Sequence, residues 1–373
     1  MTWPKGDAPY RPARAGTCAG QCHAVVILNY HGREDTVSCL HSMQPDTADL
    51  HFVVVDNGSY DGVLDAVLTV SESVTTVQST VNLGFAGGMN LGIEWATRHG
   101  ARVVTILNND TVMHPGALDI SRALALDGYA VSPTIVYDAE PDRVWFAGGT
   151  VDPQTNLARH LQARELPETG EVRATQILAG CCVTASVETW ARVGGFDESY
   201  FLNFEDSEWS LRAARAGVPL VVDTRTTIRH KVSRSFRREF SYLGLYFYVR
   251  NGLHLGRHEL GSNLGQSWRF LRQHVVPILT GSVRSGRRAQ AVRESVVVVA
   301  GLGDFLRRHR GPAPGWLQRL TLAWSSASDA RGVSPRRAAY CPSSPRRTRL
   351  SLRPTRRPAS RTRRTGRTLG PQA

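Results

Sequence analysis

Two acidic segments of the sequence carry side chains that could act on a charged, phosphorylated substrate. The segment Asn108-Asn109-Asp110 follows an apolar run, so its carboxylate would lie at the rim of a sheet. Oxygen ligands of this type suit a hard divalent cation that bridges two phosphates, and such a cation offsets the charge on a diphosphate leaving group. Asp and Asn also favour strand-to-helix turns, and taken alone this segment is more often a turn than a metal site.

The second acidic segment is the pair Glu205-Asp206, which opens a helical pattern after the aromatic stretch 200–204. Apolar neighbours raise the proton affinity of a carboxylate and suit it to work as a general base. Acidic residues at the start of a helix also simply complement its dipole, so both explanations stay open. His230, between two basic residues, is a candidate ligand for a metal or a diphosphate, although a lone surface histidine is more common.

Two further segments carry polar and glycine residues after apolar runs. Asp56 ends the run VVVDNGS, where its carboxylate could accept a hydrogen bond from a nucleobase imide or a ribose hydroxyl, or could belong to a turn. The segment 82–90 is rich in glycine, but its glycines do not match G-x-G-x-x-G in the required frame. Close approach of this backbone to a diphosphate and a flexible turn are both compatible with the sequence.

Alternating apolar runs and helical patterns supply the elements that must position these residues. We expect strands at 24–30, 51–57, 75–80, 102–108 and 129–136, and helices at 35–43, 61–70, 87–99 and from Pro115 onward. This rhythm predicts an α/β fold with a mostly parallel sheet and helices on both faces. Such sheets bind ligands beyond the carboxyl ends of their strands. We therefore expect a site there, built from Asn29, Asp56, Asn57, Asn82 and Asn108.

The second half of the chain has a more mixed pattern. It predicts strands at 176–185 and 219–223 and helices at 187–193, 204–216 and 293–308, with an aromatic, apolar stretch at 240–254. We divide the chain into a flexible segment 1–21, an α/β domain 22–235, a helical extension 236–312 and a disordered tail 313–373.

The net charge of +13 belongs to the tail alone. Residues 331–373 contain thirteen Arg and no Lys, Asp or Glu, so residues 1–330 hold 32 basic (45 minus 13) and 32 acidic side chains. A protein that binds nucleic acid or an anionic surface through this tail is the alternative function class. The tail is either a nonspecific anion tether or the product of a reading-frame error, and the sequence leaves both open.

Hydropathy and cysteine content bear on location. No run of 18 apolar residues is present, and the six cysteines are too sparse for a disulfide framework. We expect a cytoplasmic protein, or one held peripherally on the inner face of the plasma membrane. The stretch 240–254 and the helix 293–308 could lie on an anionic membrane, although buried packing is the more common use of such segments.

Six segments in this order resemble family 2 glycosyltransferases with the GT-A fold, in the rhamnosyltransferase-like branch. They are AVVILNYHG (24–32), VVVDNGSYDG (53–62), NLGFAGGMNLGI (82–93), ILNNDTVMHPGAL (106–118), GGFDESYFLNFEDSEWSLRAARAG (194–217) and IRHKVSRS (228–235). The resemblance covers about residues 22–310.

The resemblance implies a role for each candidate residue. Asp206 resembles the catalytic base, with Glu205 beside it. Asp110 resembles the last acid of the metal motif, and His230 the histidine that contacts Mg²⁺ or Mn²⁺ or the diphosphate. The residues that resemble the nucleotide-sugar site are Asn29, Asp56, Asn57, Asn82, Gly84, Asn90 and Asn108. The segment YFYVRN (246–251) also resembles the branch, without an implied role.

The implied reaction is inverting transfer of a sugar by direct displacement. The donor would be dTDP-rhamnose or a UDP-sugar, and the acceptor a glycan or a polyprenyl-linked sugar in cell-envelope polysaccharide synthesis. No specific nucleic-acid partner is implied. A nucleotide-dependent oxidoreductase is a third class, but the first strand lacks the glycine fingerprint that this class requires, and the pair at 205–206 also argues against it.

Overall fold

The computed structural model describes residues 23–43, 50–71, 73–114, 116–161, 165, 170–232 and 241–329. The predicted flexible segment 1–21 and the arginine-rich segment 331–373 lie outside the described residues. All described residues belong to one compact unit that spans Met1–Ser343.

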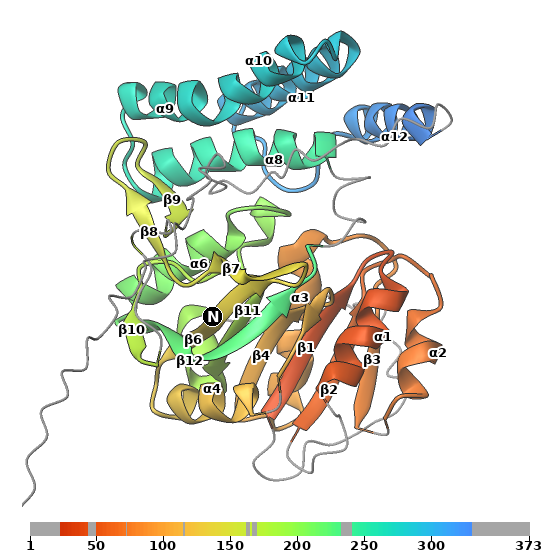
Figure 1. Cartoon of the computed structure of the whole chain (residues 1–373), viewed down its shortest axis with the longest axis vertical. Helices are drawn as coiled ribbons and strands as arrows, with labels where there is room; N and C mark the ends of the chain where they lie inside the picture. Colours follow the sequence, from red (N-terminus) through yellow and green to blue (C-terminus); the bar gives the residue numbers. More distant parts are fainter. Residues whose placement is uncertain are drawn as a thin grey trace, which may run out of the picture. The chain divides into compact units, whose positions relative to one another are not determined.

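The centre of the fold is a mixed sheet whose longest path runs β10-β12-β6-β11-β4-β1-β2-β3 (Figure 1). Four of the seven neighbouring pairs along this path are parallel, and they include β4-β1-β2-β3, where the predicted site falls. The strands of the path are β1 (His23–Asn29), β2 (Leu50–Asp56), β3 (Val74–Gln78), β4 (Val103–Asn108), β6 (Ala130–Tyr137), β10 (Val172–Ala174), β11 (Cys182–Ser186) and β12 (Leu220–His230). Two strands pair at its side, β5 (Thr111–Val112) with β12 and β7 (Glu140–Phe146) with β6. A separate hairpin joins β8 (Gly149–Asp152) to β9 (Leu157–His160).

The strands are continuous apolar runs because both faces of the sheet are covered. In β1, Val25 and Ile27 pack into one core with α1 (Arg33–Ser42), α2 (Val63–Leu68) and α4 (Ala117–Leu126). Ala24 and Val26 pack into the opposite core with α3 (Gly84–Arg98), α5 (Val187–Val193) and α6 (Glu205–Arg215). Successive side chains of a strand point to opposite faces. The predicted α/β class, with helices on both faces of the sheet, is confirmed.

Glycines explain how close α3 lies to the sheet. A Cβ added at Gly88 would meet the Leu28 side chain, and one added at Gly92 would meet Val26. These two glycines are four residues apart and therefore share one face of the helix. Part of the glycine-rich segment thus serves the packing of α3 on β1.

Several predicted boundaries are wrong by a few residues. Helix α1 begins at Arg33 after Gly32, two residues before the predicted start at 35, so Asp35 lies in its first turn. Helix α4 begins at Ala117 after Gly116, which has a positive φ, while Pro115 lies outside the described residues. Strand β12 extends through His230 beyond the predicted end at 223, because its outer half pairs with β5 and β6.

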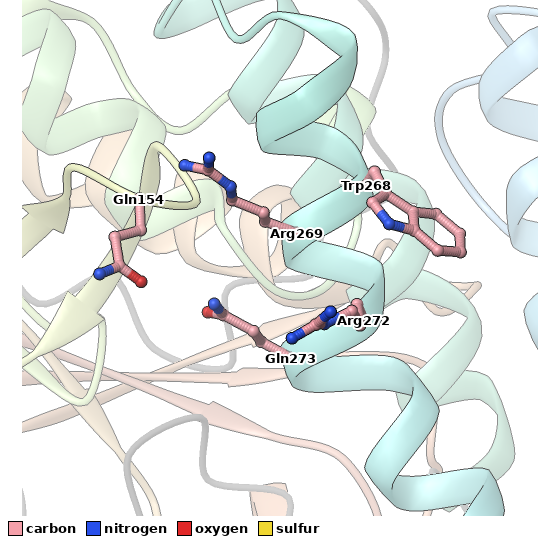
Figure 2. Close-up of a pocket in the computed structure, with 5 residues that line it drawn as sticks. All are labelled: Gln154, Trp268, Arg269, Arg272 and Gln273. Carbon is pink, nitrogen blue, oxygen red and sulfur yellow. The ribbon is translucent and has the colours of Figure 1, made fainter.

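The chain continues into a set of helices after the sheet. They are α8 (Ser241–His254), a π-helical turn (Leu255–Glu259), α9 (Leu264–Phe270), a second π-helical turn (Leu271–Val275), α10 (Val276–Arg284), α11 (Arg288–Leu306) and α12 (Gly315–Asp329). The prediction of disorder from 313 is therefore wrong as far as Asp329, because α12 packs Leu317 into the helical core. An open pocket of about 400 Å³ lies between α9 with its following turn and the β8–β9 connection (Figure 2). No helix of the described residues is long and apolar enough to span a membrane.

Candidate active site

Three polar residues lie side by side where β2, β1 and β4 end. The strand register pairs Asn29 with Asp56 and places Asn108 opposite Leu28, so the three residues share the carboxyl edge of the sheet. The sequence predicted this cluster from the order of strands, and the structure brings its members together.

Asp56 is buried, with only 1% of its surface exposed, and is surrounded by donors. Its oxygens accept from the Asn29 amide (3.1 Å), the Tyr60 N–H (2.9 Å), the Gln78 amide (2.9 Å) and the Ser59 hydroxyl. Burial raises the pKa of this carboxyl, but the hydrogen bonds from Ser59, Gln78, Tyr60 and Asn29 outweigh burial and lower it overall. The Asp56 carboxylate is therefore held in place by donors from β1, β3 and the 56–61 loop.

Asn57 and Asn82 shape the turn that leads into α3. The Asn57 amide donates to the carbonyl of Gly84 (2.9 Å), and the Asn82 side chain accepts from the Gly84 N–H (2.8 Å). Gly84 has a φ of +75°, and a Cβ there would collide with the carbonyl of Phe201. Glycine is required at this position because both the backbone conformation and the close approach exclude a side chain.

Asn90 joins α3 to the loop ahead of the acidic pair. Its amide donates to the Phe196 carbonyl and to the Glu198 carboxylate, both at 2.9 Å, and its oxygen accepts from the Phe196 N–H at 2.8 Å. The residues joined by these hydrogen bonds are 106 to 108 positions apart in the sequence. They make Asn90 a brace for the 196–198 loop, in addition to any contact with a donor sugar.

The loop before the acidic pair has an unusual backbone. Phe201, Asn203 and Phe204 all have positive φ angles, of 63°, 68° and 71°. Non-glycine residues adopt this conformation only when the surrounding structure holds them there, and such residues cluster at functional sites.

Arg250 and Asn251 of α8 hold this loop. The Asn251 amide donates to the carbonyls of Tyr200 (2.7 Å), Leu202 (2.8 Å) and Asn203 (3.1 Å). Arg250 is fully buried and donates to the side chain of Asn251 and the hydroxyl of Tyr246. The YFYVRN segment, which had no implied role in the sequence, is thus a clamp on the loop that carries the acidic pair.

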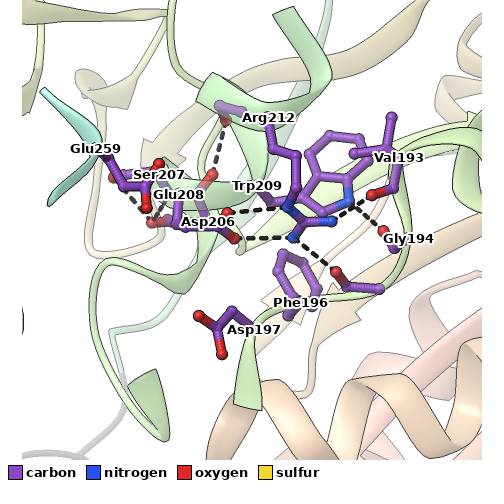
Figure 3. Close-up of polar contacts among 12 residues, drawn as sticks. Val193, Gly194, Phe196, Asp197, Asp206, Ser207, Glu208, Trp209, Arg212 and Glu259 are labelled. Carbon is purple, nitrogen blue, oxygen red and sulfur yellow. Dashed lines mark hydrogen bonds and ion pairs between the residues drawn. The ribbon is translucent and has the colours of Figure 1, made fainter. Parts of the chain in front are cut away.

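Helix α6 is anchored independently of this clamp (Figure 3). Arg212 forms a bidentate ion pair with Glu208 at 2.9 and 2.8 Å and donates to the carbonyls of Val193 and Gly195. The Trp209 indole donates to the carbonyl of Gly194 at 2.9 Å. The helix that begins with the acidic pair is therefore fixed to the segment that precedes the loop.

The two acids of the pair have different environments. Glu205 is 6% exposed, and its Oε2 has no hydrogen-bond partner among the described residues. Burial, and next the charge of Asp206, raise the pKa of Glu205 from 4.5 to about 8. Asp206 is partly exposed and accepts from the Gly180 N–H at 2.9 Å and from the Ser207 N–H at 2.6 Å. Glu205 is therefore a neutral acid at neutral pH, and Asp206 is the group of the pair with access to solvent.

Asp110 and His230 meet at the end of β12. The His230 Nε2 lies 3.0 Å from Asp110 Oδ1, and both side chains are buried. A carboxylate only accepts, so Nε2 donates, and a neutral His230 keeps its lone pair on Nδ1. Nδ1 is buried without a hydrogen-bond partner in the described part of the chain.

Trp145 and His160 complete this region, and sequence reasoning missed both. The Trp145 ring contacts the rings of His230 at 4.7 Å and His160 at 4.9 Å, edge to face. His160 ends the β8–β9 hairpin, and its pKa is lowered, first by burial, while the nearby Asp206 acts in the opposite direction. No short motif marks these residues, because β7, which carries Trp145, and the β8–β9 hairpin reach the site only through tertiary folding.

Residues 180–181 connect the two acidic regions. The Gly180 N–H donates to Asp206, and the carbonyl of Cys181 accepts from the Asn108 N–H at 2.9 Å. Burial and then the charges of Asp110 and other nearby groups, including Asp206, raise the pKa of the Cys181 thiol well above its usual range. Asp110 and Asp206, which are far apart in sequence, thus both lie near enough to Cys181 to raise the pKa of its thiol.

A divalent cation needs several ligands around it. The described residues contain no group of three His, Cys, Asp or Glu side chains suited to a metal ion. Asp110 and His230 supply one carboxylate and one imidazole. Mg²⁺ is commonly bound by one or two carboxylates together with substrate phosphates. These residues therefore fit a cation that arrives with a diphosphate and do not form a complete resident metal site.

Comparisons with known proteins agree with this arrangement. Residues 24–177 match the family model for glycosyl transferase family 2. The chain is 25% identical over 238 residues to the low-salt glycan biosynthesis hexosyltransferase Agl10 of Haloferax volcanii, across 58% of this chain and 74% of the relative. It is 27% identical over 222 residues to the N-acetylglucosaminyl-diphospho-decaprenol L-rhamnosyltransferase of Mycobacterium tuberculosis, across 52% and 71%.

These findings define the chain as a glycosyltransferase enzyme. Residues 24–177 match glycosyl transferase family 2, and the similarity to the mycobacterial relative agrees with the rhamnosyltransferase-like branch that the sequence motifs predicted. Among solved structures, GalNAc-T7 with UDP, GalNAc and Mn²⁺ is similar at a TM-score of 0.45 and 15% identity, over 70% of this chain and 57% of its own length.

Proposed function

We propose that the enzyme transfers a hexose, with rhamnose as the first candidate, from a nucleotide-diphosphate donor to a hydroxyl of a glycan or lipid-linked acceptor with inversion. The single observation that supports this most directly is the division of the acidic pair into a buried, neutral Glu205 and a solvent-accessible Asp206. One accessible carboxylate that lacks a second nucleophilic partner suits direct displacement.

In this mechanism Asp206 accepts the proton of the acceptor hydroxyl. The acceptor oxygen forms a bond to the anomeric carbon as the bond from that carbon to the diphosphate oxygen breaks, and the electron pair leaves with the nucleoside diphosphate. The Gly180 and Ser207 N–H groups orient Asp206 for the proton transfer. A bound Mg²⁺ or Mn²⁺, held by Asp110 and His230 together with the diphosphate, would supply charge stabilisation to the leaving group.

The remaining predicted residues are proposed to shape the donor site at the carboxyl edge of the sheet. Asp56, oriented by Asn29, would accept from the nucleobase, and Asn108 would contact the nucleotide or sugar. Asn57, Asn82 and Gly84 would act through the turn, and Asn90 through the 196–198 loop that it braces.

The donor and acceptor are proposed from the relatives. The mycobacterial relative is named for a diphospho-decaprenol acceptor and rhamnose, and the haloarchaeal relative for glycan biosynthesis. We therefore place dTDP-rhamnose first and UDP-sugars second as donors, and a polyprenyl-linked sugar in cell-envelope polysaccharide synthesis as acceptor. Such an enzyme would work in the cytoplasm or on the inner face of the plasma membrane.

Donor hydrolysis and transfer across nucleotide sugars, with Mn²⁺ or with EDTA, test this proposal. We expect Asp206→Asn to lower turnover by at least about 100-fold because the base is lost, while calorimetric donor binding persists. Glu188→Gln, which removes an exposed acid from the first turn of α5, serves as the matched control and should keep turnover. Near-normal turnover in the Asp206→Asn variant would show that Asp206 is not the base.

The alternative of nucleic-acid binding depends on residues 331–373, which lie outside the described residues. Deletion of these residues separates the two functions. An enzyme keeps its transfer activity after the deletion, whereas a binding protein loses its salt-sensitive affinity for nucleic acid.

A further inference from the structure

Exposed apolar side chains gather in one part of the fold. The described residues contain twelve exposed large hydrophobic side chains, and nine of them lie between residues 264 and 322. They are Leu264, Trp268, Val276, Val283, Val292, Val299, Leu306, Trp316 and Leu322. Scattered exposed apolar residues are ordinary, but a concentration of them marks an interaction site.

The charges in the same segment all have one sign at the surface. Residues 264–322 contain ten Arg, no Lys and two acids, Glu294 and Asp304. Both acids are buried, with exposed fractions of 3% and 9%, and each bonds to a neighbouring side chain, Gln290 or Tyr246. Among Arg, Lys, Asp and Glu, every exposed side chain in this segment is therefore an arginine.

Within this region, exposed apolar and basic side chains are interspersed along α9, the turn after it and α10. We define the α9–α10 surface as Leu264, Trp268, Arg269, Arg272, Val276, Val283 and Arg284. Leu264 and Trp268 are 84% and 62% exposed. Leu264 and Trp268 are one turn apart in α9 and share one side of that helix, and Arg272 follows in the π-helical turn that leads to α10. The opposite side is buried through Phe270, which packs on Tyr248 of α8 at 5.5 Å. Buried packing, the more common use of a segment such as 240–254, holds for α8, because Tyr246 and Phe247 belong to the helical core.

The pocket beside this surface contains groups that recognise anions. Arg269, Arg272 and Gln273 line it together with Gln154 from the β8–β9 connection and with Trp268. Figure 2 shows Arg269 and Gln273 extending towards Gln154, while the Trp268 indole points away from Gln154. Two guanidinium groups and two amides, with no carboxylate among the lining residues, suit phosphate oxygens.

We propose that the α9–α10 surface docks on a bilayer that contains anionic phospholipids. Trp268 and Leu264, with Val276 and Val283, enter the interface between headgroups and acyl chains, and Arg269 and Arg272 bind lipid phosphates. Tryptophan and arginine are the side chains that such an interface favours, and apolar burial combined with positive charge is the basis of peripheral binding. The proposal adds a location to the proposed function without depending on the transfer chemistry, so the two fail separately.

Flotation of the full-length protein with vesicles tests the proposal. The vesicles are phosphatidylcholine alone, or phosphatidylcholine with about 30% phosphatidylglycerol, a composition that represents an anionic surface. Loss of two arginines at about 1 kcal/mol each predicts that R269Q/R272Q lowers the partition coefficient on anionic vesicles about 30-fold. W268S/L264S should lower it about tenfold or more.

Control variants carry substitutions of the same kinds at exposed positions elsewhere in the fold. R98Q/R173Q removes two arginines that are exposed on α3 and β10, and L126S removes an exposed leucine of α4. All variants keep residues 331–373, so a difference between test and control variants cannot come from that segment. Thermal unfolding and donor hydrolysis should match the wild type in every variant, which excludes misfolding.

The possible results distinguish a membrane from a nucleic acid or a soluble phosphate ligand at the α9–α10 surface. Partition that falls in the test variants and not in the controls supports the proposal. Equal partition in test and control variants overturns it. A loss of affinity for a single-stranded oligonucleotide with unchanged vesicle binding also overturns it and assigns the surface to nucleic acid. A loss of binding to inorganic pyrophosphate with unchanged vesicle binding overturns it in favour of a soluble phosphate ligand.

Discussion

Replacement of Glu205 by Gln is expected to stabilise the protein at neutral and alkaline pH. The Glu205 side chain is buried at the start of α6, and its Oε2 lacks a hydrogen-bond partner among the described residues. Burial first, and the charge of Asp206 second, raise its pKa from 4.5 to about 8. Gln has nearly the same shape but cannot ionise, so the variant removes the titration and leaves the packing in place.

The sign and size of the effect follow from the pKa values. The folded pKa lies above the unfolded one, so the stability associated with neutral Glu205 is complete below about pH 4.5 and is lost as the pH rises to about 8. The difference between 8 and 4.5 is about 3.5 pH units, and at about 1.4 kcal/mol per unit the full loss is about 5 kcal/mol. About 3 kcal/mol of it is already lost at pH 7.

Guanidinium unfolding of the wild type and the Glu205→Gln variant at about pH 5, 7 and 9, on both sides of the titration, measures this loss. The difference in unfolding free energy between the two proteins should move in favour of the variant by several kcal/mol across this range. Asp206→Asn provides a second check, because loss of the neighbouring charge lowers the pKa of Glu205 and so reduces the pH-dependent loss. If the wild type and the Glu205→Gln variant gave parallel pH profiles, Glu205 would titrate normally and the assignment of a neutral buried acid would be refuted.

Three further predictions concern residues around the pair. Gly84→Ala should lower the unfolding free energy by about 3 kcal/mol in thermal melts, because a Cβ strains the backbone and collides with Phe201; an unchanged melt would contradict this close approach. Asn251→Ala, which removes the amide donor to the Leu202 and Asn203 carbonyls and one of several donors to the Tyr200 carbonyl, should cost about 2 kcal/mol and lower kcat more than donor affinity; equal effects on both would indicate only a loss of stability. His230→Ala should raise the Mn²⁺ concentration needed for half-maximal donor binding by about tenfold or more, and no change would remove His230 from the metal site.

The order of elements was predictable because it depends on local patterns. The apolar runs of β1, β2 and β4 are buried on both faces and read as strands from composition alone. Gly194 and Gly217 end α5 and α6 where the sequence predicted, each with a positive φ. Starts of helices were less predictable, since α1 begins at Arg33, two residues before the predicted start at 35, and α4 begins at Ala117, two residues beyond Pro115.

The supporting residues of the site could not be predicted in the same way. Arg250, Asn251 and His160 contact the site only after helices and hairpins from distant parts of the chain pack together. Asn90 resembles a donor-binding position in the sequence, but in the structure it forms hydrogen bonds with the backbone of Phe196 and with Glu198. Spacing along the chain carries no information about such partners.

The sequence by itself determined that the acids of residues 1–330 cancel the bases, and that Asp110 and the pair Glu205-Asp206 follow apolar elements in the order of a family 2 glycosyltransferase. Only the tertiary structure decided which acid of the pair is neutral. Successive residues of a helix point about 100° apart, so neighbours in sequence can have opposite surroundings. Glu205 is packed into the protein, whereas Asp206 faces the N–H of Gly180 and solvent. Desolvation depends on the chain folded around a side chain, which is why the residue types could be read from the sequence and their protonation could not.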